Sequence, residues 1–278
     1  MTGSGAAAPG AVTTASGRLR GLAAITFDFG NTLVRVDRAG LGRVVEVTAE
    51  AVCARGGIAD RVAFLAAWAE ERERQFREEL PRFREVDLAQ RVSRVLARFR
   101  GVPAPPANVP WDDVAAAACS TPDDITHVVE VYSRAFVAGL PPAPEAGALL
   151  ARLRARGLRL AILSNWPLAA TIDRYAEASG WLASLDAIVV SQRVGAIKPH
   201  AAIFAAAAAA VGDPEPAAIL HVGDDWAADV AGAKAAGWRA AYLHGRPDDS
   251  PLPSSDRNGT AVPDVELRTL GDLESHLG

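Results

Sequence analysis

Residues 25–33 read Ile-Thr-Phe-Asp-Phe-Gly-Asn-Thr-Leu, and we expect the first strand of the fold to end inside this stretch. The segment Leu22–Phe27 is short, apolar and β-branched, which is typical of a buried parallel strand. Asp28 follows at its carboxyl end, before the turn-forming residues Gly30 and Asn31. Because open α/β sheets bind ligands beyond the carboxyl ends of their strands, Asp28 is a candidate nucleophile or metal ligand. The alternative, an Asp that only begins a turn, is open at this point.

The composition of the chain favours small-molecule chemistry. Half of its 278 residues are hydrophobic, enough for a sizeable core, and a formal net charge of -4 argues against nucleic-acid or membrane-surface partners. The two cysteines, Cys53 and Cys119, fit a reducing cytosol, and no apolar stretch approaches the ~20 residues of a membrane-spanning helix. We therefore expect a cytoplasmic protein with a small-molecule substrate.

Further strands alternate with helices in the second half of the chain. This alternation predicts an α/β fold with a parallel, Rossmann-like sheet. Residues 246–263 are predicted to form a loop, and residues 270–277 a last helix. The four strands expected after the first are Leu158–Leu163, Ala187–Val190, Ala218–Val222 and Trp238–Leu243.

The stretch between the first two strands has a helical period instead. Apolar residues repeat at helical spacing in 41–52, 65–76 and 88–99, and a fourth helix is expected after Thr121 as its cap and Pro122 as its first residue. We predict a disordered tail at 1–18, an α/β core made of 19–36 and 141–278, and an all-helical insert at 37–140.

Polar residues follow several of the predicted strands. A set of carboxylates, a hydroxyl and an ammonium group at one edge of a sheet can bind a phosphoryl group and Mg²⁺. Each of these residues also has an ordinary explanation as a turn, a surface lysine or a helix cap, and it is their common position that favours function. They are Asp28, Ser164, Asn165, Lys198, Asp224, Asp225 and Asp229.

From Leu22 onward, these motifs resemble those of the haloacid dehalogenase-like hydrolase superfamily. The helical insert is similar to the small helical cap that closes over the active site in that family. The resemblance implies a sheet in the order 5-4-1-2-3. The matching residues are Asp28 and Thr32 in the first motif, Ser164 in the second, Lys198-Pro199 in the third, and Gly223, Asp224 and Asp229 in the fourth.

The resemblance also implies roles. Asp28 would attack the substrate and form an aspartyl intermediate, while Ser164 and Lys198 would act with it on the phosphoryl group. Mg²⁺ would bind to Asp28, Asp224 and the backbone carbonyl of residue 30. The remaining expected roles are phosphate binding by Thr32 and Asn165 and support of the site by Asp225 and Asp229, the last of which also suits a helix cap.

The chain departs from the family pattern at position 30. Phosphatases of the family have a second Asp there as general acid and base, whereas this chain has Gly30. Three hypotheses follow: a Mg²⁺-dependent phosphatase, a 2-haloacid dehalogenase that would use Arg35 or Arg38, and a protein that binds a phospholigand without turnover. A phosphonatase is disfavoured, because the only lysines are Lys198 and Lys234 and neither lies in the helical insert.

Overall fold

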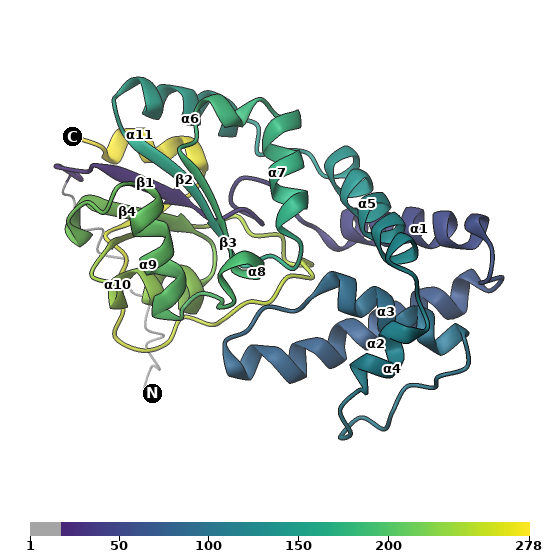
Figure 1. Cartoon of the computed structure of the whole chain (residues 1–278). Coiled ribbons are helices and arrows are strands. Elements are labelled where there is room, and N and C mark those ends of the chain that lie inside the picture. The colour runs from purple at the N-terminus through teal and green to yellow at the C-terminus, as the bar shows by residue number, and fades with distance from the viewer. Residues whose placement is uncertain (1–17) are drawn as a thin grey trace, which may run out of the picture.

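The computed structural model describes residues 18–278, so the tail predicted at 1–18 lies, apart from Arg18, outside the described residues. A parallel sheet of six strands forms the centre of the molecule, in the order β3-β2-β1-β4-β5-β6 (Figure 1). The five predicted strands and their order are confirmed, and β6 adds a sixth strand beside β5. The bounds are β1 Ala24–Phe27, β2 Arg159–Ser164, β3 Ala187–Val190, β4 Ile219–Gly223, β5 Arg239–Leu243 and β6 Val265–Leu267.

Helices cover both faces of this sheet. Ile25 and Phe27 of β1 are fully buried with the apolar residues of α6, α7 and α11, whereas Ala24 packs with those of α9 and α10. This alternation of neighbouring side chains places β1 in the middle of a three-layer arrangement. The helices are α6 Ala146–Ala155, α7 Ala169–Ala178, α8 Ser191–Val194, α9 Ala201–Ala210, α10 Gly232–Ala235 and α11 Leu273–His276, with shorter turns η2 Trp181–Ala183, η3 Pro216–Ala218 and η5 Leu270–Asp272 and the π-helical segment η4 Trp226–Ala231.

The chain between β1 and α6 is helical, and its helices form a lobe beside the sheet (Figure 1). We call residues 38–139 the helical lobe. The predicted capping of its last helix is confirmed, because Thr121 and Asp124 form a reciprocal capping box and Pro122 begins α5. The short helix α4 was not predicted. The lobe contains α1 Arg38–Arg55, α2 Arg61–Glu79, η1 Leu80–Arg82, α3 Leu88–Phe99, α4 Asp113–Ala118 and α5 Pro122–Gly139.

The segment between η1 and α3 connects the helical lobe to the α/β core. The backbone N–H of Ile197 donates to the carbonyl of Phe83 at 3.0 Å. The hydroxyl of Ser191 donates to Glu85 at 2.5 Å and accepts from the backbone N–H of Trp166 at 2.9 Å. Burial raises the pKa of the Glu85 carboxyl to about 7, although its hydrogen bond from Ser191 opposes the shift. Within residues 18–278, no helix combines the length and hydropathy required to cross a bilayer.

The raised pKa of Glu85 predicts how stability depends on pH. Folding favours the neutral carboxyl, so its contribution is fully present below the ordinary pKa of 4.5 and is lost as the pH rises through about 7. Glu85→Gln cannot ionise, and it should gain up to about 3 kcal/mol relative to wild type between about pH 5 and about pH 8. Urea denaturation at both pH values measures this difference, with the exposed Glu46→Gln as the control. An unchanged difference between Glu85→Gln and wild type would contradict the prediction.

Candidate functional site

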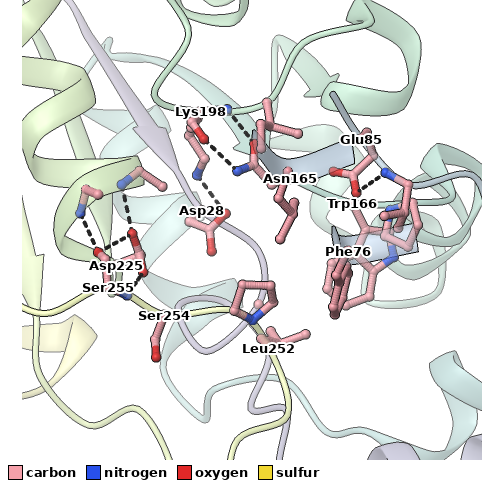
Figure 2. A pocket seen from close by; sticks show the side chains of 18 of the residues that line it. Asp28, Phe76, Glu85, Asn165, Trp166, Lys198, Asp225, Leu252, Ser254 and Ser255 are labelled. Carbon is pink, nitrogen blue, oxygen red and sulfur yellow. Dashed lines mark hydrogen bonds and ion pairs between the residues drawn. The ribbon is translucent and has the colours of Figure 1, made fainter. Parts of the chain in front are cut away.

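A cavity of about 400 Å³ lies between the carboxyl edge of the sheet and the helical lobe (Figure 2). The core side of its lining brings together most of the residues that the sequence predicted. Thr32 and Ser164 do not line the cavity. Both are buried, and each is close in sequence to a residue that lines it. The predicted residues in the lining are Asp28, Gly30, Asn165, Lys198, Asp224, Asp225 and Asp229.

Lys198 is at the centre of the charged groups in this cavity. Its side chain is almost completely buried, and its Nζ donates to Asp28 Oδ1 at 2.8 Å and to Asp229 Oδ1 at 2.6 Å. A third bond goes to the carbonyl of Leu163 at 2.8 Å, at the end of β2. Three acceptors arranged around one ammonium group satisfy its donors and hold Asp28 in one orientation.

These contacts determine the charges of the cluster. Burial alone would lower the pKa of Lys198, but the negative charges of Asp229 and Asp28 raise it above its ordinary value. Burial likewise opposes ionisation of Asp229, yet Lys198 and His221 bring the pKa of Asp229 well below its usual range. The cavity therefore contains a permanent cation beside a permanent carboxylate.

Two buried residues that the sequence did not predict, His221 and Thr26, form a chain of contacts to Asp229. His221 of β4 contacts Asp229 Oδ1 through Nε2 at 3.0 Å, and its Nδ1 lies 2.8 Å from the hydroxyl of Thr26 on β1. Thr26 and His221 are register partners in neighbouring strands. Burial and the nearby Lys198 lower the pKa of His221, so the neutral ring is favoured. A polar pair inside two buried strands was the signal that could have revealed them.

Asp224, which follows β4, has a different partner from Asp28 and Asp229. Arg246, from the loop of residues 244–264 between β5 and β6, donates to Asp224 Oδ2 at 3.0 Å. Burial, followed by the charges of Asp28 and Asp229, raises the pKa of Asp224 well above its ordinary value. Arg246 is distant in sequence from every motif, and no local pattern predicted it.

The carboxylates of this cluster fit a divalent cation. Oxygen atoms of Asp28, Asp224 and Asp229 all lie within 4.8 Å of one another. Burial raises the pKa of Asp28, and the charge of Asp229 adds to this effect while Lys198 opposes it. On the core side of the cavity, these three and Asp225 make four carboxylates against the two cations Lys198 and Arg246. A hard dication with oxygen ligands would remove this excess of negative charge.

The turn after β4 positions the carboxylates closely. A Cβ at Gly223 would lie 2.2 Å from the carboxyl group of Asp229, so only glycine permits this approach. Asp225 caps η4 by accepting from the backbone N–H of Ala228 at 2.7 Å, and both its oxygens accept from Ser255. Figure 2 shows Asp225 paired with Ser255 rather than directed at Asp28.

Thr32 of the first motif and the polar residues of the second divide into two groups. The hydroxyls of Ser164 and Thr32 are buried and have no hydrogen-bond partner among the described residues. Buried hydroxyls normally find a partner, so their orphaned state agrees with a ligand that accepts from them. The amide of Asn165 is instead committed to the backbone of Lys198, with bonds of 2.7 Å and 3.1 Å.

At position 30, an apolar side chain occupies the space that an Asp would need. A Cβ built on Gly30 would lie 2.6 Å from Leu252 Cδ1 and 3.4 Å from the ring of Trp166. Leu252 comes from the same loop as Arg246, and Figure 2 shows it beside the cavity below Asp28. A leucine side chain therefore lies where the side chain of an Asp at position 30 would begin.

The helical lobe contributes the remaining wall of the cavity. Its apolar residues include Phe76 and Leu80, and its polar groups come from Arg72, Glu85, Arg91 and Tyr132. Arg35 and Arg38, which the dehalogenase hypothesis would use, do not line the cavity.

Comparisons with known proteins agree with this geometry. A curated ribulose-1,5-bisphosphate 5-phosphatase from Halopiger xanaduensis is 29% identical over 153 residues, which cover 55% of this chain and 63% of that protein. A phosphoserine phosphatase from Thermus thermophilus is 39% identical over 112 residues, 39% of this chain and 44% of that protein. The similarity therefore spans less than two thirds of either relative.

The crystal structure of a 2-haloacid dehalogenase from Pseudomonas syringae pv. Tomato DC3000 has the same fold. It matches with a TM-score of 0.60 at 18% identity, covering 92% of this chain and 97% of that one. A sequence model described as haloacid dehalogenase-like hydrolase matches residues 22–237, which is most of the chain. The chain therefore belongs to the haloacid dehalogenase-like hydrolase family.

Proposed function

We propose that this protein is a Mg²⁺-dependent phosphatase that hydrolyses a small phosphorylated metabolite through an aspartyl-phosphate intermediate. The observation that carries the proposal is the carboxylate of Asp28, held by Lys198 in a cluster with the carboxylates of Asp224 and Asp229. The printed names of the two curated relatives, both phosphatases, support it. The cytoplasmic location expected from the cysteine content is part of the same proposal.

The reaction uses Asp28 as the nucleophile. One oxygen of Asp28 attacks phosphorus, the bond from phosphorus to the ester oxygen breaks, and that oxygen leaves as an alkoxide or phenolate with the bonding electron pair. Water then attacks phosphorus, and the phosphorus–Asp28 bond breaks to release phosphate and regenerate the carboxylate, while the proton that the water gives up balances the alkoxide or phenolate. Lys198 favours the ionised form of Asp28 and balances the charge of the phosphoryl group.

The other residues of the site bind and orient. Asp28, Asp224 and the carbonyl of Gly30 would hold Mg²⁺, and the ion would neutralise charge on the phosphoryl oxygens when bound. The orphaned hydroxyls of Ser164 and Thr32 suit the role of donors to those oxygens. Asn165 contributes to phosphate binding in part because its amide holds the backbone of Lys198 in place. Asp225 and Asp229 support the site through Ser255 and Lys198.

Gly30 limits what this site can do with a poor leaving group. No side chain at this position can protonate the departing oxygen, and the side chain of Leu252 lies where an Asp side chain would begin. This observation favours activated substrates such as acyl or aryl phosphates, and it also supports the second candidate, a phospholigand-binding protein with little turnover. The dehalogenase hypothesis is weaker, because the side chain of Arg35 is 61% exposed and Arg38 is also outside the cavity lining.

Replacement of the nucleophile tests the covalent mechanism. Asp28→Asn should lower the rate of phosphate-ester hydrolysis by several orders of magnitude, because an amide cannot form the intermediate. The measurement is steady-state kinetics with an aryl phosphate, with thermal melting to confirm folding. Asp173→Asn on α7 is the matched control, since Asp173 is half-exposed and, within residues 18–278, forms its one ion pair with Arg193. Retention of more than about 1% of wild-type activity would exclude the mechanism.

Mg²⁺ binding should depend on Asp224. Asp224→Ala removes one of two carboxylate ligands, and we expect its affinity for Mg²⁺ in titration calorimetry to fall by at least about tenfold. Asp248→Ala is the control, because it removes an exposed carboxylate from the loop that carries Arg246. Equal Mg²⁺ responses in wild type and Asp224→Ala would place the metal elsewhere and favour the binding-protein hypothesis.

An Asp at position 30 should reduce the preference of this protein for substrates with good leaving groups. Because Asp at position 30 would collide with Leu252, the test is the double variant Gly30→Asp/Leu252→Ala, with Leu252→Ala alone as the control for the opened space. A general acid contributes about 10²- to 10⁴-fold, so the ratio of aryl to alkyl phosphate hydrolysis should fall in the double variant only. If wild type already hydrolyses both classes equally fast, another residue supplies the proton.

A further inference from the structure

Arg91, on α3 of the helical lobe, is a buried cation that lines the cavity but has no acidic partner. It is 4% exposed, and its Nε donates to Gln75 Oε1 at 2.9 Å. Within residues 18–278, its two terminal nitrogens have no hydrogen-bond partner, and no carboxylate lies within 4.0 Å of its guanidinium group. A buried, uncompensated charge is costly unless something pairs with it.

Neighbouring arginines of the helical lobe show that the lack of a partner is specific to Arg91. Arg94, one turn along the same helix, is bound by Glu78 at 2.9 Å and by Asp113 at 2.7 Å. Arg98, a further turn along, reaches Glu70 at 2.6 Å. These two arginines stabilise the packing of the lobe, whereas Arg91 faces the cavity.

The acidic groups near Arg91 are already occupied. Glu71 accepts from the indole of Trp111 at 2.8 Å and lies within ion-pair distance of Arg74 and Arg98. Glu85 accepts from Ser191 and has a pKa raised to about 7 by burial. Neither carboxylate therefore forms an ion pair with Arg91, although the negative charge of each opposes the lowering of its pKa.

Arg72 on α2 adds a second positive charge to the same wall. Its guanidinium group lies 4.5 Å from the ring centre of Phe76, pairs with the exposed Glu73 at 2.9 Å and donates to the carbonyl of Pro251. Burial lowers the pKa of Arg91 to about 10, and the charge of Arg72 acts in the same direction. This wall of the cavity is thus short of negative charge, in contrast to the carboxylate-rich core side.

We propose that Arg91, assisted by Arg72, binds a second anionic group of the substrate, a carboxylate or a further phosphate, while Asp28 acts on the phosphoryl group. This inference rests on the proposed phosphatase function and narrows its substrate class. A guanidinium group with free terminal nitrogens suits either anion, because its planar fork can donate two parallel hydrogen bonds. The cavity of about 400 Å³ fits a small molecule that carries both groups.

The test compares three kinds of substrate: an aryl phosphate without a second anionic group, a phosphorylated hydroxy acid and a bisphosphorylated alcohol. Arg91→Gln should lower kcat/KM for the second or the third by about 10- to 100-fold, mainly through KM, because it removes a charge-assisted contact. The aryl phosphate should change by less than about twofold. Whichever of the two substrates with a second anionic group is affected identifies the chemistry of the subsite.

Three further variants separate binding from structure. Arg77→Gln removes an exposed arginine from α2 and should leave all three kcat/KM values unchanged. Arg91→Lys keeps the charge but loses the fork, and should recover part of the selectivity. If Arg91→Gln does not fold, Arg91→Lys and Arg72→Gln decide the question by the same selectivity ratio.

An equal loss for all three substrates, or no loss for any, would overturn the proposal. If wild type hydrolyses none of them, the phosphatase proposal fails by itself. The subsite is then tested by titration calorimetry of wild type and Arg91→Gln with the phosphorylated hydroxy acid, the bisphosphorylated alcohol and the aryl phosphate as ligands. The subsite is supported if wild type binds a ligand with a second anionic group more tightly than the aryl phosphate and Arg91→Gln does not. Equal binding of all ligands to both proteins rejects it.

Discussion

The buried ammonium group of Lys198 is the interaction on which the rest of the site depends. It connects Asp28, just after β1, with Asp229 on η4 and with the end of β2. Its own backbone is held by Asn165, so segments that follow three strands are bonded around one charge. Removing one member of such a buried ionic group typically costs about 3–5 kcal/mol, because the others remain buried without a partner. The cluster is therefore both a structural centre and a prepared electrostatic environment.

The 244–264 loop and the helical lobe surround this centre and contribute different groups to the cavity. The 244–264 loop brings Arg246 to Asp224, which adds a positive charge to the core side. It also brings Leu252 to the space beside Gly30, so an apolar side chain lies there. The helical lobe closes the cavity from the other side with apolar groups and with Arg91. A core wall rich in carboxylates thus faces a lobe wall rich in guanidinium groups.

Much of the fold followed from local patterns in the sequence. Short β-branched runs alternating with helical periods predicted the five strands, the family resemblance implied their order, and Thr121-Pro122 predicted the start of α5. Among the elements that were missed, β6 has three residues, α8 four and α4 six, too few to display a period. The last helix was predicted as one piece, but the structure begins it with the turn η5 before α11.

The sequence by itself determined which residues meet at the carboxyl edge of the sheet. Parallel strands all end at that edge, so the position of Asp28, Lys198 or Asp224 along the chain sufficed to place it there. Only the tertiary structure decided what surrounds these groups. Leu252 in the space beside Gly30 and Arg91 without an acidic partner are relations between segments far apart in the chain, and no local period or motif encodes such a relation. They arise because packing the lobe and the loop against the sheet determines which charges are paired and which remain free to meet a ligand.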